Sequence, residues 1–131
     1  MTDDVVDTDV VSFRFKRDSR ARAYRPFVVG RRAWISFMTL AELPAWTMLH
    51  RWGASRRQEL SRFLGQFAVY HSDNHLAALW AEVTFQAQRG GKAIDGADAW
   101  VAATALALDA PLVTNNPDDF SAAKRLTILS N

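Results

Sequence analysis

The sequence predicts an α/β fold in which a mostly parallel, five-stranded sheet lies between helices. Short apolar runs of strand length alternate along the chain with longer segments of helical periodicity. This alternation is typical of βα units, whose successive strands pair in parallel. No internal repeat and no long linker divides the 131 residues, so we expect a single domain over residues 1–131.

The chain is expected to begin with a short strand and two helices. Residues 4–8 have the apolar character of a strand, and residues 9–17 have helical spacing with apolar side chains on one face. Residues 19–27 are expected to form another short helix. Asp3 and Asp4 are expected to be solvated near the chain end.

A second strand is expected at residues 33–38, because apolar side chains alternate along this segment. Thr39 is then expected to cap a helix over residues 40–52. Pro44 would remove a backbone hydrogen bond inside that helix. It therefore predicts a kink, or a helix that begins nearer Glu42.

The middle of the chain is expected to contain two further helices and a strand. Ser55 is a candidate N-cap for a helix over residues 56–67, and residues 68–71 form the third predicted strand. Asp73 is the candidate N-cap of a long helix over residues 74–89, which ends at a pair of glycines.

The last third of the chain predicts a closely packed helix and two strands. Residues 96–110 form an Ala-rich helix. A short strand follows at residues 112–114, and the sequence NNPDDF over residues 115–120 is typical of a turn. Residues 126–130 are expected to form the final strand.

The composition excludes several classes of protein. There are no cysteines, so disulfides and thiolate metal sites are excluded. The acidic N-terminal segment has no long apolar run and does not resemble a signal peptide. No stretch reaches the roughly 18 uncharged apolar residues of a membrane span. We therefore expect a soluble, cytoplasmic protein that does not bind a membrane.

Basic residues are concentrated in two segments, although the formal net charge is only +2. Residues 14–32 carry seven Arg and one Lys with a single acid, Asp18, and more arginines fall within residues 51–62. The acids are concentrated in residues 3–9 and 95–119. This distribution suits a polyanion that meets basic flanks beside an acidic centre. The alternative is that the basic segments are solvated helix faces.

Acidic and amide side chains fall where predicted strands end or helices begin. Asp7 lies at the end of the first strand, Glu42 follows the second, and Asp98 lies in the first turn of the Ala-rich helix. Four more such residues follow the strand at 112–114: Asn115, Asn116, Asp118 and Asp119. Because the carboxyl ends of parallel strands meet at one edge of a sheet, we expect these side chains to converge there.

Clustered carboxylates repel each other and raise each other's pKa values, and a hard divalent cation removes this conflict. Mg²⁺ or Mn²⁺ prefers oxygen ligands and needs only one or two direct carboxylates. Such a cation lowers the pKa of a bound water and stabilises charge that develops on a phosphate. Together with arginines that can bind a nucleic-acid backbone, this pattern predicts hydrolysis of phosphodiester bonds.

Four stretches of the chain resemble the PIN domain and, within it, the VapC-type ribonuclease toxins of bacterial toxin–antitoxin pairs. They are VVDTDVVSFRFK, ISFMTLAEL, IDGADAWVAATALALDAPLVTNN and NNPDDF, and they span nearly the whole chain. The resemblance implies a five-stranded parallel sheet between helices and cleavage of RNA, transfer RNA being the usual class, with Mg²⁺ or Mn²⁺. It also implies a homodimer and a cognate VapB-type antitoxin whose C-terminal segment enters the catalytic groove.

Position by position, the resemblance implies that Asp7, Glu42 and Asp98 are the first three catalytic acids, with Asp7 and Asp98 on the metal. The fourth catalytic position is Asn116 or Asp119. A neutral Asn116 would weaken a second metal site, so we expect one well-held ion.

Neighbouring residues are expected to support this site. Thr8, Thr114 and Asn115 are candidates for orienting the substrate or a metal-bound water. Asp9 is expected at the start of the following helix, where it can cap free N–H groups, so Asp9→Asn should be mild. The candidate contacts to RNA phosphates are Arg14, Arg20 and Arg22.

Several candidates have structural alternatives. Asp98 stands three residues after Asp95, which is the spacing of a capping box with Asp95 as N-cap. Glu42 could interact with a helix dipole instead of a metal. Trp46 and Trp52 are candidates for a dimer or antitoxin surface, although tryptophan more often packs in a core.

Two other functions stay open at this point. The segment VVDTDVV also fits the D-x-D-x-V pattern of haloacid-dehalogenase-type phosphatases, in which Asp7 would be the nucleophile. Against this, the second acidic pair follows a turn and the chain is short for that class. The other alternative is a PIN-like module that binds a partner or nucleic acid with a degenerate metal site, and the neutral Asn116 favours it.

Overall fold

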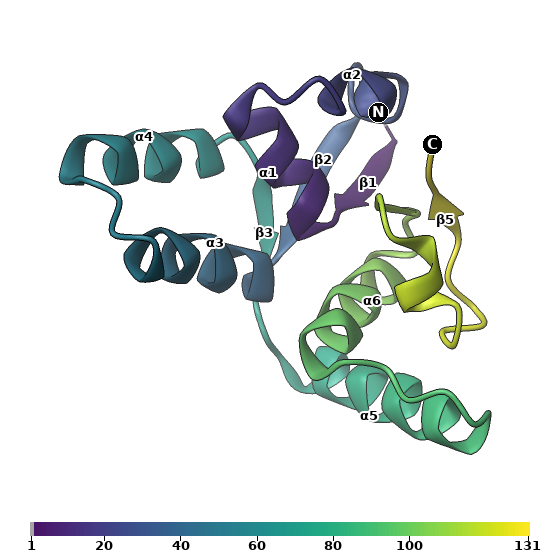
Figure 1. Cartoon of the computed structure of the whole chain (residues 1–131). Coiled ribbons are helices and arrows are strands. Elements are labelled where there is room, and N and C mark those ends of the chain that lie inside the picture. The colour runs from purple at the N-terminus through teal and green to yellow at the C-terminus, as the bar shows by residue number, and fades with distance from the viewer. Residues whose placement is uncertain (1) are drawn as a thin grey trace.

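The computed structural model describes residues 2–131, and within them five strands form one sheet in the order β3-β2-β1-β4-β5 (Figure 1). Every neighbouring pair of strands is parallel, which confirms the predicted α/β class. The strands are β1 (Asp3–Val6), β2 (Arg32–Ser36), β3 (Ala68–Tyr70), β4 (Leu112–Val113) and β5 (Ile128–Leu129).

Six α-helices connect and cover these strands within the described residues. They are α1 (Thr8–Lys16), α2 (Ala21–Tyr24), α3 (Phe37–Leu49), α4 (Ala54–Leu64), α5 (Asn74–Arg89) and α6 (Gly96–Leu108). Two short 3₁₀ turns cover Arg25–Phe27 and Pro117–Phe120. None of the helices in residues 2–131 is both long and apolar enough to cross a membrane.

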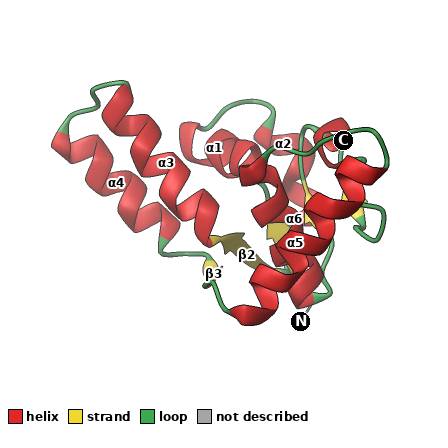
Figure 2. Ribbon diagram, turned by 90° about the horizontal axis from the view of Figure 1, so that it is seen from below, coloured by secondary structure: helices red, strands yellow, loops and turns green. Residues whose placement is uncertain are grey.

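The two faces of the sheet are covered by different helices, because successive strand residues point to opposite faces. Val6 and Ile35 join an apolar cluster that includes side chains of α1, α3 and α4. Val5 and Leu112 join a second cluster with α6 and Val83 of α5. Figures 1 and 2 show the α3–α4 pair and the α5–α6 pair at opposite sides of the molecule. Both faces are therefore buried, as in other parallel sheets.

Helix α3 begins directly after β2, because the Ser36 hydroxyl accepts a hydrogen bond from the Met38 N–H at 3.0 Å. The prediction that Thr39 caps this helix is wrong, since Thr39 is buried within it. The helix begins at Phe37, five residues before Glu42, and Pro44 lies inside it. The earlier start places Glu42 on the second turn, where it can face the end of β1.

Of the N-caps predicted for α4, α5 and α6, two are correct and one is wrong. Asp73 caps α5 and Asp95 caps α6 as predicted, each accepting a helical N–H, at 2.7 Å and 2.8 Å respectively. The prediction for Ser55 is wrong, because α4 begins earlier with Gly53 as its N-cap. Glycine offers no side-chain oxygen for the free N–H groups, so this start carries no cap signal beyond backbone conformation.

The expectation that Asp3 and Asp4 are solvated is also wrong, because both lie in β1. Asp4 is fully buried, and two nitrogens of the Arg31 guanidinium donate hydrogen bonds to its carboxylate. Asp3 accepts a hydrogen bond from the indole N–H of Trp34 at 3.2 Å. The pairing of β1 with β2 brings these partners beside the two acids.

Candidate active site

The carboxyl ends of β1, β2 and β4 lie side by side, because β1 is placed between β2 and β4 in the sheet. A cavity of about 570 Å³ lies at this edge. Its lining includes five carboxylates and one amide, from Asp7, Asp9, Glu42, Asp98, Asp119 and Asn116. The structure therefore brings together every residue that the sequence proposed for catalysis, without showing what each one does.

Asp7 follows β1 directly and is the N-cap of α1. Its Oδ1 accepts the Thr8 N–H at 2.8 Å, and its Oδ2 accepts the Thr114 hydroxyl at 2.7 Å. The side chain is only 6% exposed. Burial first, and then the negative charge of Asp9, raise the pKa of Asp7 to about 7. An anion held in this way is costly unless a cation lies near it.

We expect Thr114→Val to lower the free energy of unfolding by about 1–3 kcal/mol at a pH where Asp7 is ionised. The fully buried Thr114 hydroxyl donates to Asp7 and accepts the Asn116 N–H at 3.0 Å, so valine leaves both without this partner. The lost hydrogen bond favours the ionised acid, so the cost should shrink at acid pH. Urea denaturation measures this, with the exposed Thr127→Val as the control. Equal losses for both variants would contradict the prediction.

Asp9 joins the first turn of α1 to the turn that follows β4. Its Oδ1 accepts the Val10 N–H at 2.7 Å, which agrees with the predicted place near the helix start. Its Oδ2 accepts the Asn116 side-chain amide at 2.7 Å and the Asn115 N–H at 3.2 Å. The true N-cap is Asp7, and the links to Asn115 and Asn116 were not predicted. Burial raises the pKa of Asp9.

Two threonines hold Glu42 against the end of β1. The Thr8 hydroxyl donates to Glu42 Oε1 at 3.0 Å, and the hydroxyls of Thr8 and Thr39 lie 2.8 Å apart. Because Thr8 has one proton to donate, Thr39 must donate to Thr8 when Thr8 donates to Glu42. Thr39, wrongly predicted as a cap, is thus part of the chain of hydroxyls that orients the acid.

Asp98 lies in the first turn of α6 and lines the cavity together with the four other carboxylates. Burial is the largest cause that raises its pKa to about 6, followed by the charges of Asp95, Asp119, Glu42 and Asp9. Asp95 supplies the N-cap, as the sequence predicted, so α6 begins without help from Asp98. Four acids from separate parts of the chain therefore influence the ionisation of one carboxyl group.

The donor set fits a hydrated divalent cation. In residues 2–131, no group of three or more His, Cys, Asp or Glu side chains is spaced to hold one ion directly. Mg²⁺ retains several waters and needs only one or two direct carboxylates, so a cavity this size with five carboxylates suits it. Asp7 and Asp98 both line the cavity, and the pKa values of both are raised first by burial and then by neighbouring negative charge. A bound cation would offset the repulsion between these carboxylates and favour their ionised forms.

The side chain of Asn115 lies away from the cavity that the acids line. Its amide oxygen accepts a hydrogen bond at 2.5 Å from the hydroxyl of Tyr24, which is buried. Only its backbone N–H reaches the site, as a donor to Asp9. The residue thus fastens the turn after β4 to α2, and contact of its side chain with the substrate stays a prediction.

The cation that lines the acidic cavity is Lys16, which sequence reasoning did not select. The sequence contains the signal: Asp9, Ser12 and Lys16 recur at helical spacing on one face of α1, and all three line the cavity. The predicted Arg20 instead pairs with Asp18 at 2.7 Å.

The other two predicted arginines also lie outside this cavity. Arg14 and Arg22 both line a separate cavity beside α2. Their contact with RNA phosphates stays a prediction.

Trp46 also lines the acidic cavity, so one of the two tryptophans proposed for a partner surface lies at the site. Its ring centroid lies 4.2 Å from the Lys16 ammonium and 5.0 Å from the ring of Trp52. Leu49, which is 80% exposed, lines the cavity beside it. The acids are thus bordered by an apolar rim on the side of α3.

Comparisons with known proteins agree with this architecture. A model of the PIN domain family matches residues 5–126. Among solved structures, VapBC2 from Rickettsia felis bound to a DNA fragment of its promoter is 21% identical, with 98% of each chain covered and a TM-score of 0.84. VapBC-1 from nontypeable Haemophilus influenzae has the same identity, coverage and TM-score.

A third solved structure, FitAcB from Neisseria gonorrhoeae, is 24% identical, with 96% of each chain covered and a TM-score of 0.81. No curated protein matches the chain. The structural likeness supports the fold, and the family model covers nearly the whole chain. On this basis the protein belongs to the PIN domain family.

Proposed function

We propose that this protein is a metal-dependent endoribonuclease toxin of the VapC type that hydrolyses RNA phosphodiester bonds in the cytoplasm. The observation that carries the proposal is the convergence of five carboxylates, from the start of α1, from α3, from the start of α6 and from the 3₁₀ turn after β4, on one cavity. Membership of the PIN domain family and the likeness to toxin–antitoxin complexes support it. A structured RNA such as transfer RNA is the proposed substrate class.

Asp7 and Asp98 would supply the direct oxygen ligands of one Mg²⁺ or Mn²⁺ ion. When bound, such an ion lowers the pKa of a water and stabilises the charge on the phosphate. Glu42 and Asp119 line the same cavity and can accept hydrogen bonds from waters around the ion. Ionised Asp7 and Asp98 are required for this binding, so the metal must displace protons that burial and neighbouring charge favour.

The remaining residues keep these acids in place and hold the substrate. The Thr8 hydroxyl orients Glu42, and Asp9 holds Asn116 through the side-chain amide. Because that amide donates to Asp9 through its nitrogen, its oxygen can still act as a neutral acceptor. Lys16 lines the cavity as a cation and can bind a phosphate oxygen of the substrate.

A cognate VapB-type antitoxin is the proposed protein partner. The similar solved structures are described as VapBC and FitAcB complexes, which is the basis for extending this partnership to the present chain. The exposed Met48 and Leu49 on α3, beside Trp46, offer an apolar surface next to the acids. We also propose that the toxin forms a homodimer.

The direct test is cleavage of transfer RNA by the purified protein without antitoxin. We expect cleavage with Mg²⁺ or Mn²⁺, none with excess EDTA, and recovery when the divalent ion is restored. Gel analysis of end-labelled products measures this, and single-stranded DNA of matching sequence serves as the control substrate. Cleavage that persists in EDTA, or that is equally fast on the DNA, would rule out a metal-dependent ribonuclease.

One observation favours a second candidate, a PIN-like module that binds without cleaving. Asn116 supplies a neutral amide at the edge of the cavity, tied to Asp9, where a further acid would strengthen metal binding. This candidate predicts no saturable binding of Mn²⁺ that depends on Asp98. The phosphatase alternative has no support from the comparisons, because the family model that matches is the PIN domain.

A further inference from the structure

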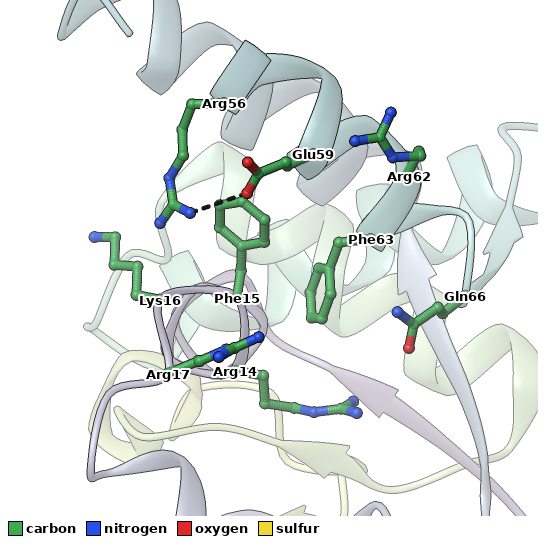
Figure 3. Close-up of a pocket in the computed structure, with 9 residues that line it drawn as sticks. All are labelled: Arg14, Phe15, Lys16, Arg17, Arg56, Glu59, Arg62, Phe63 and Gln66. Carbon is green, nitrogen blue, oxygen red and sulfur yellow. Dashed lines mark hydrogen bonds and ion pairs between the residues drawn. The ribbon is translucent and has the colours of Figure 1, made fainter. Parts of the chain in front are cut away.

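A second cavity, of about 650 Å³, lies between α1 and α4, as Figure 3 shows. Side chains from the C-terminal end of α1 face side chains from α4 across it. This cavity is called the basic cavity below. The basic residues that line it are Arg14, Lys16, Arg17, Arg56 and Arg62. Glu59 is the single carboxylate in the lining. The proposed catalytic residues do not line this cavity.

The positive charge of the basic cavity exceeds the negative charge nearby. Glu59 forms an ion pair with Arg56 at 3.2 Å, and both side chains are about half exposed. In the described part of the chain, no carboxylate forms a salt bridge with Arg14, Arg17 or Arg62. Partial burial also lowers the pKa of the Arg14 guanidinium. An anion bound here would be attracted by several cations that form no salt bridge with a carboxylate of the described residues.

Aromatic rings hold two of the guanidinium groups in position. Arg56 lies over the rings of Phe15 and Trp52, with centroid distances of 4.7 Å and 5.2 Å. Arg14 lies over the ring of Phe63 at 5.9 Å. Figure 3 shows Phe15 and Phe63 between the cations of the two helices. A guanidinium stacked on its face keeps the N–H groups at its edge available, and these match the oxygens of a phosphate. Arg56 donates through one of its terminal nitrogens to Glu59, and its other N–H groups stay available for a phosphate.

The basic cavity adjoins the acidic cavity, because Lys16 lines both. Its ammonium lies over the ring of Trp46, which belongs to the acidic cavity. A strand whose scissile phosphate lies among the acids can therefore continue past Lys16 toward Arg56 and Arg62. An acidic peptide following the same path would have to place its own carboxylates among five others, which is unfavourable.

We propose that the basic cavity binds a phosphate of single-stranded RNA outside the scissile position, and so fixes the direction in which the strand leaves the catalytic cavity. The proposal rests on the proposed ribonuclease function and adds the residues that hold the flanking strand. The guanidinium groups of Arg56 and Arg62 bind the phosphate, and the rings of Phe15 and Phe63, which line the same cavity, give the flanking nucleotides apolar contacts.

The test measures the binding of a fluorescein-labelled oligouridylate of about 12 nucleotides by fluorescence anisotropy. EDTA is present so that no hydrolysis occurs. For the double variant Arg56→Ala/Arg62→Ala we expect at least about a tenfold rise in Kd and a salt slope reduced by about 0.7, the value for one phosphate of a single strand. Arg57→Ala is the matched control, because Arg57 lies on the same helix and lines a different cavity beside α3. Equal Kd values for the double variant and this control would overturn the proposal.

Two further measurements make the outcome specific. Circular dichroism and thermal melting of each variant establish that a raised Kd comes from a folded protein. A polyglutamate peptide tests the alternative ligand: if it binds wild type more tightly than the oligouridylate and loses affinity in the double variant, the cavity is a protein-docking site and the proposal is overturned. Cleavage of transfer RNA by wild type tests the ribonuclease function separately, so failure of either proposal can be recognised.

Discussion

Asp98→Asn is expected to slow cleavage of RNA in saturating Mg²⁺ by at least about 100-fold. The carboxyl of Asp98 lies in the acidic cavity, and burial together with the charges of Asp95 and Asp119 raises its pKa to about 6. Asparagine keeps the size of the side chain but removes the charge that a cation would need. Asp95 already caps α6, so the fold should be retained. The measurement is single-turnover cleavage with labelled RNA.

The matched control is Asp118→Asn, because Asp118 is exposed on the same rim of the molecule and does not line the acidic cavity. We expect this variant to cleave at nearly the wild-type rate. Calorimetric titration with Mn²⁺ should show saturable binding to wild type and much weaker binding to Asp98→Asn. If cleavage persists undiminished in Asp98→Asn, the assignment of this residue is wrong. If neither protein binds Mn²⁺, the non-enzymatic module becomes the better interpretation.

The second prediction concerns Asp7 and the stability of the metal-free protein. Its pKa is raised from 3.8 to about 7 in the folded state, mainly by burial. The folded protein therefore holds this proton more tightly than the unfolded chain does. The resulting stabilisation is complete at pH values below the unfolded pKa and is lost as the pH rises through about 7. Asp98, whose pKa is raised to about 6, contributes with the same sign.

We therefore expect the protein in EDTA to unfold more readily at about pH 8.5 than at about pH 5.5, by on the order of 2–4 kcal/mol. Asp7→Asn removes the buried charge, so the variant should show a weaker pH dependence and exceed wild type in stability at the higher pH. Urea denaturation at both pH values measures this. Mg²⁺ should stabilise wild type most at alkaline pH and have little effect on the variant. A wild type that is more stable at the alkaline pH in EDTA would contradict the prediction.

Much of the fold follows from local pattern in the sequence. The apolar residues of β1 and β4 and the helical stripe of α5 are strong periodic signals, and they predicted elements that the structure contains. Helix starts were less predictable. Several Ser, Thr and Asp residues near a boundary can each act as a cap, and backbone conformation selects one of them, as Ser36 instead of Thr39 shows.

Long-range polar contacts could not be inferred from the sequence. The Asp4 carboxylate meets Arg31 across 27 residues, and Asp9 meets Asn116 across 107 residues. No periodicity links positions so far apart, because such pairs depend on strand order and on how helices are rotated about their axes. The buried place of Asp4 and the link from Asp9 to Asn116 thus emerged only from the folded chain.

The sequence by itself determined which acids stand at the carboxyl edge of the sheet, because strand ends and helix starts are local features that parallel pairing brings to one edge. The positions of Asp7, Glu42 and Asp98 near strand ends and helix starts were therefore enough to predict that these acids lie near one another. The helical spacing of Asp9, Ser12 and Lys16 places this lysine on the same face of α1 as an acid, but only the tertiary structure decided that this face lines the acidic cavity. The rotation of α1 against its neighbours lets Lys16 line both the acidic and the basic cavity, while Arg14 lines the basic cavity and not the acidic one. Side-chain direction on a packed helix depends on those neighbours as well as on spacing.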